Sequence, residues 1–210
     1  MSGLSGRKGS FIETILVNTR TSDRNIRGSR RTAVVRYEGG KHLIPIVSIV
    51  GRSNTGKTTL IEKLIPELRR RGYRVATIKH NIHGFDIDHE GKDSWRHKEA
   101  GARLTVIASP HRIAVIEDVS KDYELSELRD RYIRDVDIIL SEGFKGNPHP
   151  KIEVVRSGMK HDPLCSAEDN LMAVASDHPV DRGVPCLDID DVHVIANLIE
   201  DRFLRGSLRS

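Results

Sequence analysis

The feature that most constrains this chain is a nine-residue stretch between an apolar run and an amphipathic helix pattern. Residues 51–59 read GRSNTGKTT and match GxxxxGK[ST], the pattern of a phosphate-binding loop. Gly51 and Gly56 let the chain turn with its amide N–H groups facing inward, toward the positive end of the following helix dipole. Lys57 can reach the β- and γ-phosphates, and the Thr58 hydroxyl can bind Mg²⁺. The motif predicts a nucleoside triphosphate site formed by Gly51, Arg52, Ser53, Asn54, Thr55, Gly56, Lys57, Thr58 and Thr59.

The flanking segments have the character that this motif requires. Residues 43–50 (LIPIVSIV) form a short branched apolar run, which predicts the central strand of a parallel sheet. After the loop, apolar residues recur at helical spacing, at Ile61, Leu64, Ile65 and Leu68. Pro66 predicts a bend in this helix, and Gly72 predicts its end.

The rest of the chain alternates between strand and helix patterns. Strands are expected at residues 73–79, 104–109, 113–118, 136–140, 150–156, 171–176 and 185–189. Helices are expected at 124–133 and 191–204, and a third helix, capped by Asp93 or Ser94, is expected to continue through Ala100. Residues 104–118 turn at Pro110 and predict an antiparallel hairpin at an edge of the sheet. The fold class is therefore α/β, of the P-loop NTPase type, with a doubly wound, mostly parallel sheet.

Charge divides the 210 residues into two parts. Residues 1–41 hold nine Lys and Arg against three acidic residues, a net charge of +6, so the remaining chain carries −2 of the total of +4. We therefore expect a basic N-terminal extension at 1–43, partly disordered or packed on a partner, a nucleotide-binding domain at 44–205 and a tail at 206–210. The extension is either a solvated leader or a contact for acidic partners, anionic cofactors or nucleic acid. It lacks interleaved aromatic residues, which disfavours nucleic acid.

Composition and cysteine spacing exclude several classes of protein. No run of about eighteen apolar residues is present, and the N-terminus lacks the layout of a signal peptide, so we expect a cytoplasmic protein without a membrane span. Cys165 and Cys186 form no CxxC pair, which argues against a zinc ribbon or a disulfide framework.

A triphosphate site also needs an acidic residue for the metal shell. Ligands of open α/β sheets bind at the carboxyl ends of strands, and Glu142 follows the buried run 136–140 (VDIIL). We therefore predict Thr58 and Glu142 as the Mg²⁺ ligands; the alternative for Glu142 is a carboxylate that caps a turn. Asp137 lies earlier in the strand and is expected to sit too deep.

Residues 79–97 are unusually rich in histidine and aspartate, and three interpretations are open. As a switch segment, Asp88 or Asp93 could orient water or complete the magnesium shell, which makes these two the catalytic candidates. As a metal site, the imidazoles and carboxylates suit zinc or nickel, although their spacing matches no standard signature. The third interpretation is a solvated polar loop. The metal candidates are His80, His83 and His89 with Asp86 or Asp88.

Several blocks in order resemble the family of molybdopterin-guanine dinucleotide biosynthesis adapter proteins, the MobB family. Besides the phosphate loop, they are LIPEL at 64–68, IKH at 78–80, DID at 86–88, GKDS at 91–94, AGA at 100–102, SEGFK at 141–145 and PKIEV at 150–154. The resemblance covers about residues 44–205, and the first 43 residues fall outside it.

This resemblance implies a GTP-binding protein with weak intrinsic GTPase activity that uses Mg²⁺. It would act as an adapter beside the guanylyltransferase that joins GMP to molybdopterin in molybdenum cofactor biosynthesis, and it would form a homodimer. Asp177 resembles the family's loop after a late strand, where a carboxylate could accept two hydrogen bonds from guanine. The alternative for Asp177 is an Asx turn that closes the strand.

Two other functions share the phosphate loop. A P-loop kinase for a small metabolite would need an arginine-rich lid, and the only arginines that suggest one are Arg96, Arg103 and Arg112. A metallochaperone GTPase that delivers nickel would suit the histidine-rich loop, but that loop contains no cysteine. Three observations would separate these functions. Slow GTP hydrolysis without an acceptor favours the adapter, rapid acceptor-dependent ADP release favours a kinase, and stoichiometric nickel retention favours a metallochaperone.

Overall fold

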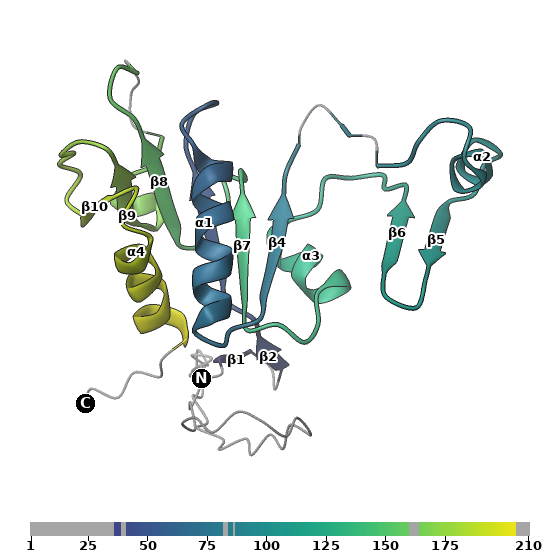
Figure 1. Cartoon of the computed structure of the whole chain (residues 1–210), viewed down its shortest axis with the longest axis horizontal. Helices are drawn as coiled ribbons and strands as arrows, with labels where there is room; N and C mark the ends of the chain where they lie inside the picture. The colour runs from purple at the N-terminus through teal and green to yellow at the C-terminus, as the bar shows by residue number, and fades with distance from the viewer. Residues whose placement is uncertain (1–35, 39–40, 82–83, 86, 160–163, 205–210) are drawn as a thin grey trace, which may run out of the picture.

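A computed structural model describes residues 36–38, 41–81, 84–85, 87–159 and 164–204 of the chain (Figure 1). Most of the predicted basic extension and the tail at 206–210 lie outside these residues. So do two of the metal candidates, His83 and Asp86.

Six parallel strands form the central sheet. They lie in the order β10-β9-β8-β3-β7-β4, and every neighbouring pair is parallel. The strands are β3 (Ile46–Val50), β4 (Val75–Lys79), β7 (Ile138–Glu142), β8 (Lys151–Val155), β9 (Leu171–Ser176) and β10 (Cys186–Asp188). Because β3 lies between β7 and β8, the phosphate loop leaves the sheet from an interior strand, as predicted.

The predicted strand at 43–50 is divided in two. A small antiparallel hairpin of β1 (Arg36–Glu38) and β2 (Lys41–Leu43) ends at Leu43, and β3 begins only at Ile46. Pro45 lies between them. Proline has no N–H to donate to a strand ladder, which explains why the apolar run does not form one continuous strand.

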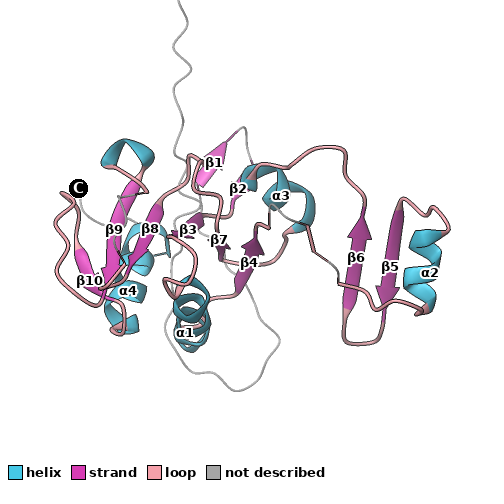
Figure 2. Cartoon of the chain, turned by 90° about the horizontal axis from the view of Figure 1, so that it is seen from above, coloured by secondary structure: helices cyan, strands magenta, loops and turns pink. Residues whose placement is uncertain are grey.

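Helices cover both faces of the central sheet (Figure 2). On one face lie α1 (Lys57–Arg70) and α4 (Val192–Ile199), which continues as the π-helical turn η2 (Glu200–Leu204); on the other lies α3 (Leu125–Tyr132). Val47 packs in the α1 cluster, whereas Ile46 packs with Leu125 of α3. Side chains of successive strand residues point to opposite faces, so this division confirms the doubly wound arrangement.

The first helix follows the sequence prediction. It runs from Lys57 to Arg70 without interruption at Pro66, and Gly72 has a φ of 91°, the left-handed conformation expected after a helix. The bend expected at Pro66 stays a prediction. A short 3₁₀ turn, η1 (Ala167–Asp169), precedes β9.

The predicted hairpin is present but lies apart from the central sheet. Strands β5 (Leu104–Ala108) and β6 (Ile113–Glu117) pair only with each other, and α2 (Asp93–Glu99) packs beside β5. We call residues 93–117 the hairpin arm; Figures 1 and 2 both show it extending away from the sheet. The prediction that it forms an edge of the sheet is therefore wrong, because apolar alternation identifies paired strands without specifying which edge they join. Helix α2 starts at Asp93, so its cap is Lys92 rather than Asp93 or Ser94.

Candidate nucleotide-binding site

The backbone of the phosphate loop requires glycine at two positions. Gly51 has a φ of 152°, and a Cβ atom there would lie 2.7 Å from the carbonyl oxygen of Val154 and 2.8 Å from Thr55 Oγ1. Gly56 has a φ of 95° and is the residue that precedes α1. A side chain at Gly51 would collide with β8, and one at Gly56 would strain the backbone. The loop can therefore turn tightly enough for its amides to converge at the start of α1.

Lys57 is folded back over this loop. Its Nζ donates to the carbonyl oxygen of Arg52 at 2.7 Å, and Thr55 Oγ1 donates to the same oxygen at 3.0 Å. Burial lowers the pKa of the Lys57 ammonium, Glu142 acts to raise it, and Lys79 lowers it further. A phosphate could replace the Arg52 carbonyl as the acceptor, and its negative charge would stabilise the ammonium.

The two predicted magnesium ligands lie in direct contact. Thr58 Oγ1 at the start of α1 donates to Glu142 Oε1 at the end of β7, over 2.9 Å. Lys79 lies at the end of β4, which pairs with β7 in the sheet, and its Nζ is 3.6 Å from Glu142 Oε2. A hydroxyl and a carboxylate are hard oxygen ligands that suit Mg²⁺, which keeps several waters and phosphate oxygens as its other ligands. The donor set therefore fits Mg²⁺, and Thr58 and Glu142 are the residues that would hold it.

Asp137 lies at the other end of β7, as its place in the sequence predicted. Its carboxylate accepts hydrogen bonds from the Arg74 amide at 2.7 Å and from the Arg74 guanidinium at 3.2 Å. The Asp137 carboxylate is therefore paired with Arg74 at the end of the strands that lies opposite the phosphate loop.

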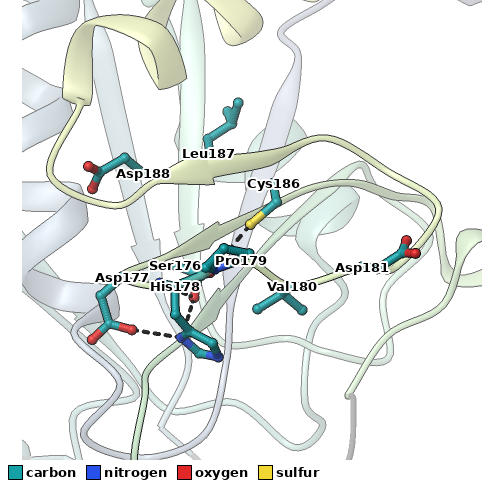
Figure 3. Close-up of a pocket in the computed structure, with 9 residues that line it drawn as sticks. All are labelled: Ser176, Asp177, His178, Pro179, Val180, Asp181, Cys186, Leu187 and Asp188. Atoms are coloured by element: carbon teal, nitrogen blue, oxygen red, sulfur yellow. Dashed lines mark hydrogen bonds and ion pairs between the residues drawn. The ribbon is translucent and has the colours of Figure 1, made fainter.

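Asp177 follows β9 and lines an open cavity of about 700 Å³ (Figure 3). Its Oδ1 accepts from the Ser157 amide at 2.8 Å and lies 2.9 Å from His178 Nδ1, while Oδ2 accepts from Ser157 Oγ at 3.0 Å. The hydrogen bond with His178, the bonds from Ser157 and the charge of Arg156 hold the pKa of Asp177 well below its usual range. A carboxylate has about four acceptor positions. Two guanine donors would therefore have to displace at least one of these bonds.

Arg156 connects the two parts of this site, and the sequence analysis did not single it out. Its Nε lies 3.4 Å from the Thr55 carbonyl oxygen in the phosphate loop, and its Nη1 lies 3.6 Å from Asp177 Oδ2. A second cavity of about 230 Å³ runs between these groups and is lined by Arg52, Thr55, Arg156 and Ser157. The rule that identified Glu142 also applies to Arg156, which directly follows a strand beside β3.

The two catalytic candidates make no contact with the phosphate loop among the hydrogen bonds and ion pairs of the described residues. Asp93 begins α2 in the hairpin arm, is exposed and lies 3.8 Å from Arg96. Asp88 is half-buried; its Oδ1 accepts from the amide of His89 at 2.9 Å, and its buried Oδ2 has no partner among the described residues. Figures 1 and 2 place α2 away from the start of α1, so this single chain does not bring Asp93 to the phosphate loop.

The histidine-rich segment forms no metal site in the described part of the chain. No group of three or more His, Cys, Asp or Glu residues there is arranged to hold a metal ion. His80 instead contacts Asp122, with 2.8 Å between Nε2 and Oδ2, and its ring stacks on Phe144 at a centroid distance of 4.1 Å. The lid candidates also lie on or beside the hairpin arm: Arg96 is in α2, Arg103 precedes β5 and Arg112 precedes β6.

Comparison with known proteins gives consistent matches. A family model described as MobB, molybdopterin guanine dinucleotide synthesis protein B, matches residues 46–177. The chain is 43% identical to a molybdopterin-guanine dinucleotide biosynthesis adapter protein of Haemophilus influenzae, over 75% of this chain and 89% of that protein. It is 41% identical to the protein of the same description from Escherichia coli, over 76% and 94% of the two chains.

Solved structures agree with the sequence matches. A crystal structure of molybdopterin-guanine biosynthesis protein B has a TM-score of 0.61 at 37% identity and covers 73% of this chain and 95% of its own. The crystal structure of Bacillus subtilis MobB has a TM-score of 0.60 at 28% identity, over 78% and 99% of the two chains.

Proposed function

The chain belongs to the MobB family, and from this premise we propose that it binds GTP with Mg²⁺ and acts as an adapter in molybdopterin guanine dinucleotide synthesis. The contact that carries the proposal is the hydrogen bond between Thr58 and Glu142, because it joins the phosphate loop to a strand-end carboxylate. That pairing supplies both protein ligands that a magnesium-bound triphosphate needs.

The loop residues have separate tasks in this proposal. The amides of residues 51–59 bind phosphate oxygens, and Lys57 exchanges the Arg52 carbonyl for the β- and γ-phosphates. Thr58 and Glu142 hold Mg²⁺, which when bound neutralises charge on the β- and γ-phosphates. Asp177 selects guanine by accepting from its N1–H and amino group, with Ser157 and Arg156 holding the carboxylate in place.

Hydrolysis is proposed to be slow. Asp88 and Asp93 stay the candidates for orienting the attacking water, and the position of α2 supports a weak intrinsic reaction, because Asp93 must approach the nucleotide from elsewhere (Figure 1). A rearranged arm or a second copy of the chain would bring it closer.

We propose that the hairpin arm forms the homodimer contact. By register, Val106 lies opposite Val115 and Ala108 opposite Ile113, so these side chains share one face of the hairpin. Val106, Val115 and Ile113 are all exposed, Ile113 by 72%. A two-stranded hairpin is marginally stable alone, and a contiguous apolar face of this kind is typical of an interface. A second copy offers the matching surface, with the guanylyltransferase as the separate partner of the assembled adapter.

The next question is where in the cell the protein works. Among the described residues, no helix has the length and apolar character needed to cross a bilayer. We propose that the protein works in the cytoplasm, with molybdopterin or the molybdenum cofactor as the cargo of its partner enzyme.

Calorimetric titration with GTP and with ATP, each with Mg²⁺, tests the central proposal. We expect saturable binding with a preference for GTP, slow release of phosphate without an acceptor, and capture of the guanylyltransferase from a purified mixture. Arg69→Ala, an exposed substitution at the far end of α1, is the matched control for changes in the loop. Absence of triphosphate binding by the folded wild-type chain would contradict the proposal. Rapid phosphate transfer to a small metabolite would favour a kinase instead.

A further inference from the structure

A third cavity lies beside Lys79 at the end of β4 and Phe144 after the end of β7. It has a volume of about 620 Å³ and is lined by β4 and the loop after it, β6, the segment before α3, α3 itself and the loop after β7. Among the lining residues are Lys79, His80, Val115, Asp122, Tyr123 and Phe144. Lys79 joins it to the nucleotide site, because the Nζ of this lining residue is 3.6 Å from Glu142 Oε2. Whatever occupies this cavity therefore lies next to the end of the triphosphate that binds the metal.

The walls of this cavity suit a flat aromatic ring. The rings of His80 and Phe144 are stacked with centroids 4.1 Å apart and an interplanar angle of 25°, which gives the cavity one aromatic surface. Tyr123 adds a second ring, with Lys121 Nζ 5.0 Å from its centroid. Val115 supplies aliphatic surface and also belongs to the hairpin face proposed for the homodimer contact, so the cavity lies beside that interface. Aromatic side chains in offset stacks bind planar heterocycles through the same contacts that they make with one another.

The polar groups of the cavity indicate which hydrogen-bond donors and which charge a bound ring would carry. Asp122 is largely exposed; its Oδ2 contacts His80 Nε2 at 2.8 Å, and Oδ1 has no hydrogen bond to any described residue. A carboxylate is an acceptor that matches a ring edge carrying an amino group beside an N–H. Lys79 and Lys121 line the same cavity and provide two ammonium groups for an anionic substituent. Glu117, the other carboxylate, already accepts from Arg131 and Tyr132.

We propose that this cavity binds a pterin that carries a phosphate, in the orientation that presents the phosphate to Lys79 and Lys121. The ring lies against Phe144 and Tyr123, and Asp122 accepts from its 2-amino group and N3–H. The inference rests on the proposed role in molybdopterin chemistry and extends it, because it makes the adapter itself a carrier of the pterin beside GTP. Nucleotide and pterin would then meet at Glu142 and Lys79.

Fluorescence titration of the full chain with pterin-6-carboxylate, a stable anionic pterin, tests this site. Stacking on Phe144 and Tyr123 should quench the pterin in a saturable manner, with or without GTP. Asp122→Asn keeps the shape of an exposed side chain and should weaken binding about tenfold through loss of a charged acceptor. Lumazine-6-carboxylate has an acceptor oxygen in place of the 2-amino group and serves as the matched ligand. Asp122→Asn should not weaken its binding, because an asparagine amide can donate to that oxygen.

The controls separate this inference from the proposed function. Lys57→Ala should lose GTP and retain the pterin, since Lys57 does not line the cavity. Tyr123→Leu should weaken both pteridines about tenfold. Wild-type chain that binds GTP without quenching the pterin would overturn the pterin site while leaving the nucleotide site intact. Unchanged pterin affinity in Tyr123→Leu would place the bound pterin elsewhere on the chain and would equally overturn the inference.

Discussion

The central sheet and the hairpin arm are built from the same kinds of residue in opposite surroundings. In β3, Val47 and Ile49 have no exposed surface, whereas in the arm Val106 is 53% exposed. The sheet has helices on both faces, whereas the arm has α2 beside β5 and contacts α3 through Glu117 at the end of β6. Branched apolar residues therefore predict strands in both regions, while the presence of a covering layer distinguishes a folded core from a surface that needs a partner.

The largest expected effect is on triphosphate affinity, at the phosphate loop that leaves the central sheet. Lys57→Ala should lower triphosphate affinity about a thousandfold, or about 4 kcal/mol, because it removes the only ammonium within the loop. Circular dichroism should show an unchanged fold, and titration with GTP measures the affinity. Binding that matched the wild type would place the nucleotide elsewhere, and Arg69→Ala should behave as the wild type.

The next effect concerns the packing of the core itself. Glu67 is buried between α1 and α4; it contacts Arg70 and Arg71 at 2.8 and 2.7 Å and His193 at 3.1 Å. Glu67→Gln should lower the free energy of unfolding by about 2 to 3 kcal/mol, since Arg71 loses one of its two buried carboxylate partners and keeps Glu200. Chemical denaturation measures the change, and Glu62→Gln on the exposed side of the same helix is the control.

The same carboxylate makes the stability of the core depend on pH. Hydrogen bonds from Arg70, followed by those from Arg71 and His193, lower the pKa of Glu67 from 4.5 to about 2. A group with a lowered pKa in the folded state stabilises the protein above its unfolded pKa, so this contribution should be present above about pH 4.5 and lost as pH falls toward 2. Glu67→Gln should flatten the stability curve in that interval. An identical slope in both proteins would assign the acid sensitivity to other groups.

A change in the arm should leave the core unaffected, which tests the comparison most directly. Val106→Asp should raise the dimer dissociation constant about thirtyfold, or about 2 kcal/mol. It should change the free energy of core unfolding by less than about 0.5 kcal/mol. Sedimentation equilibrium measures the association, and Val194→Asp, an exposed valine on α4, is the control. Loss of core stability in Val106→Asp would show that the arm is an integral part of the fold.

The smallest effect is expected at Asp177. Asp177→Asn replaces one acceptor oxygen with an N–H₂ donor, so the preference for GTP over ATP should fall about tenfold with at most about a twofold change in ATP affinity. Parallel titrations with the two nucleotides give the ratio. An unchanged ratio would leave Asp177 as the group that holds Ser157 at the end of β9.

Several parts of the site could be predicted from the sequence because their physics is local or follows a strand-end rule. The phosphate loop forms within nine residues, and Glu142 was found because a carboxylate at the end of a buried strand faces the ligand side of an open sheet. Arg156 was missed because its importance depends on contacts with Thr55 and Asp177, which lie 101 and 21 residues away in the chain. The pairing of His80 with Asp122 was missed for the same reason.

The sequence by itself determined the loop, its strand and helix, the parallel α/β class and the pairing of Thr58 with Glu142, because hydrophobic period, glycine and strand ends act over short stretches of chain. Only the tertiary structure decided that the hairpin stands apart from β4, that Asp177 is already held by three hydrogen bonds, and that segments far apart in the chain form an aromatic cavity beside Lys79. The physical reason is that alternation of apolar residues specifies which face of a strand is buried but carries no information about which distant segment covers that face.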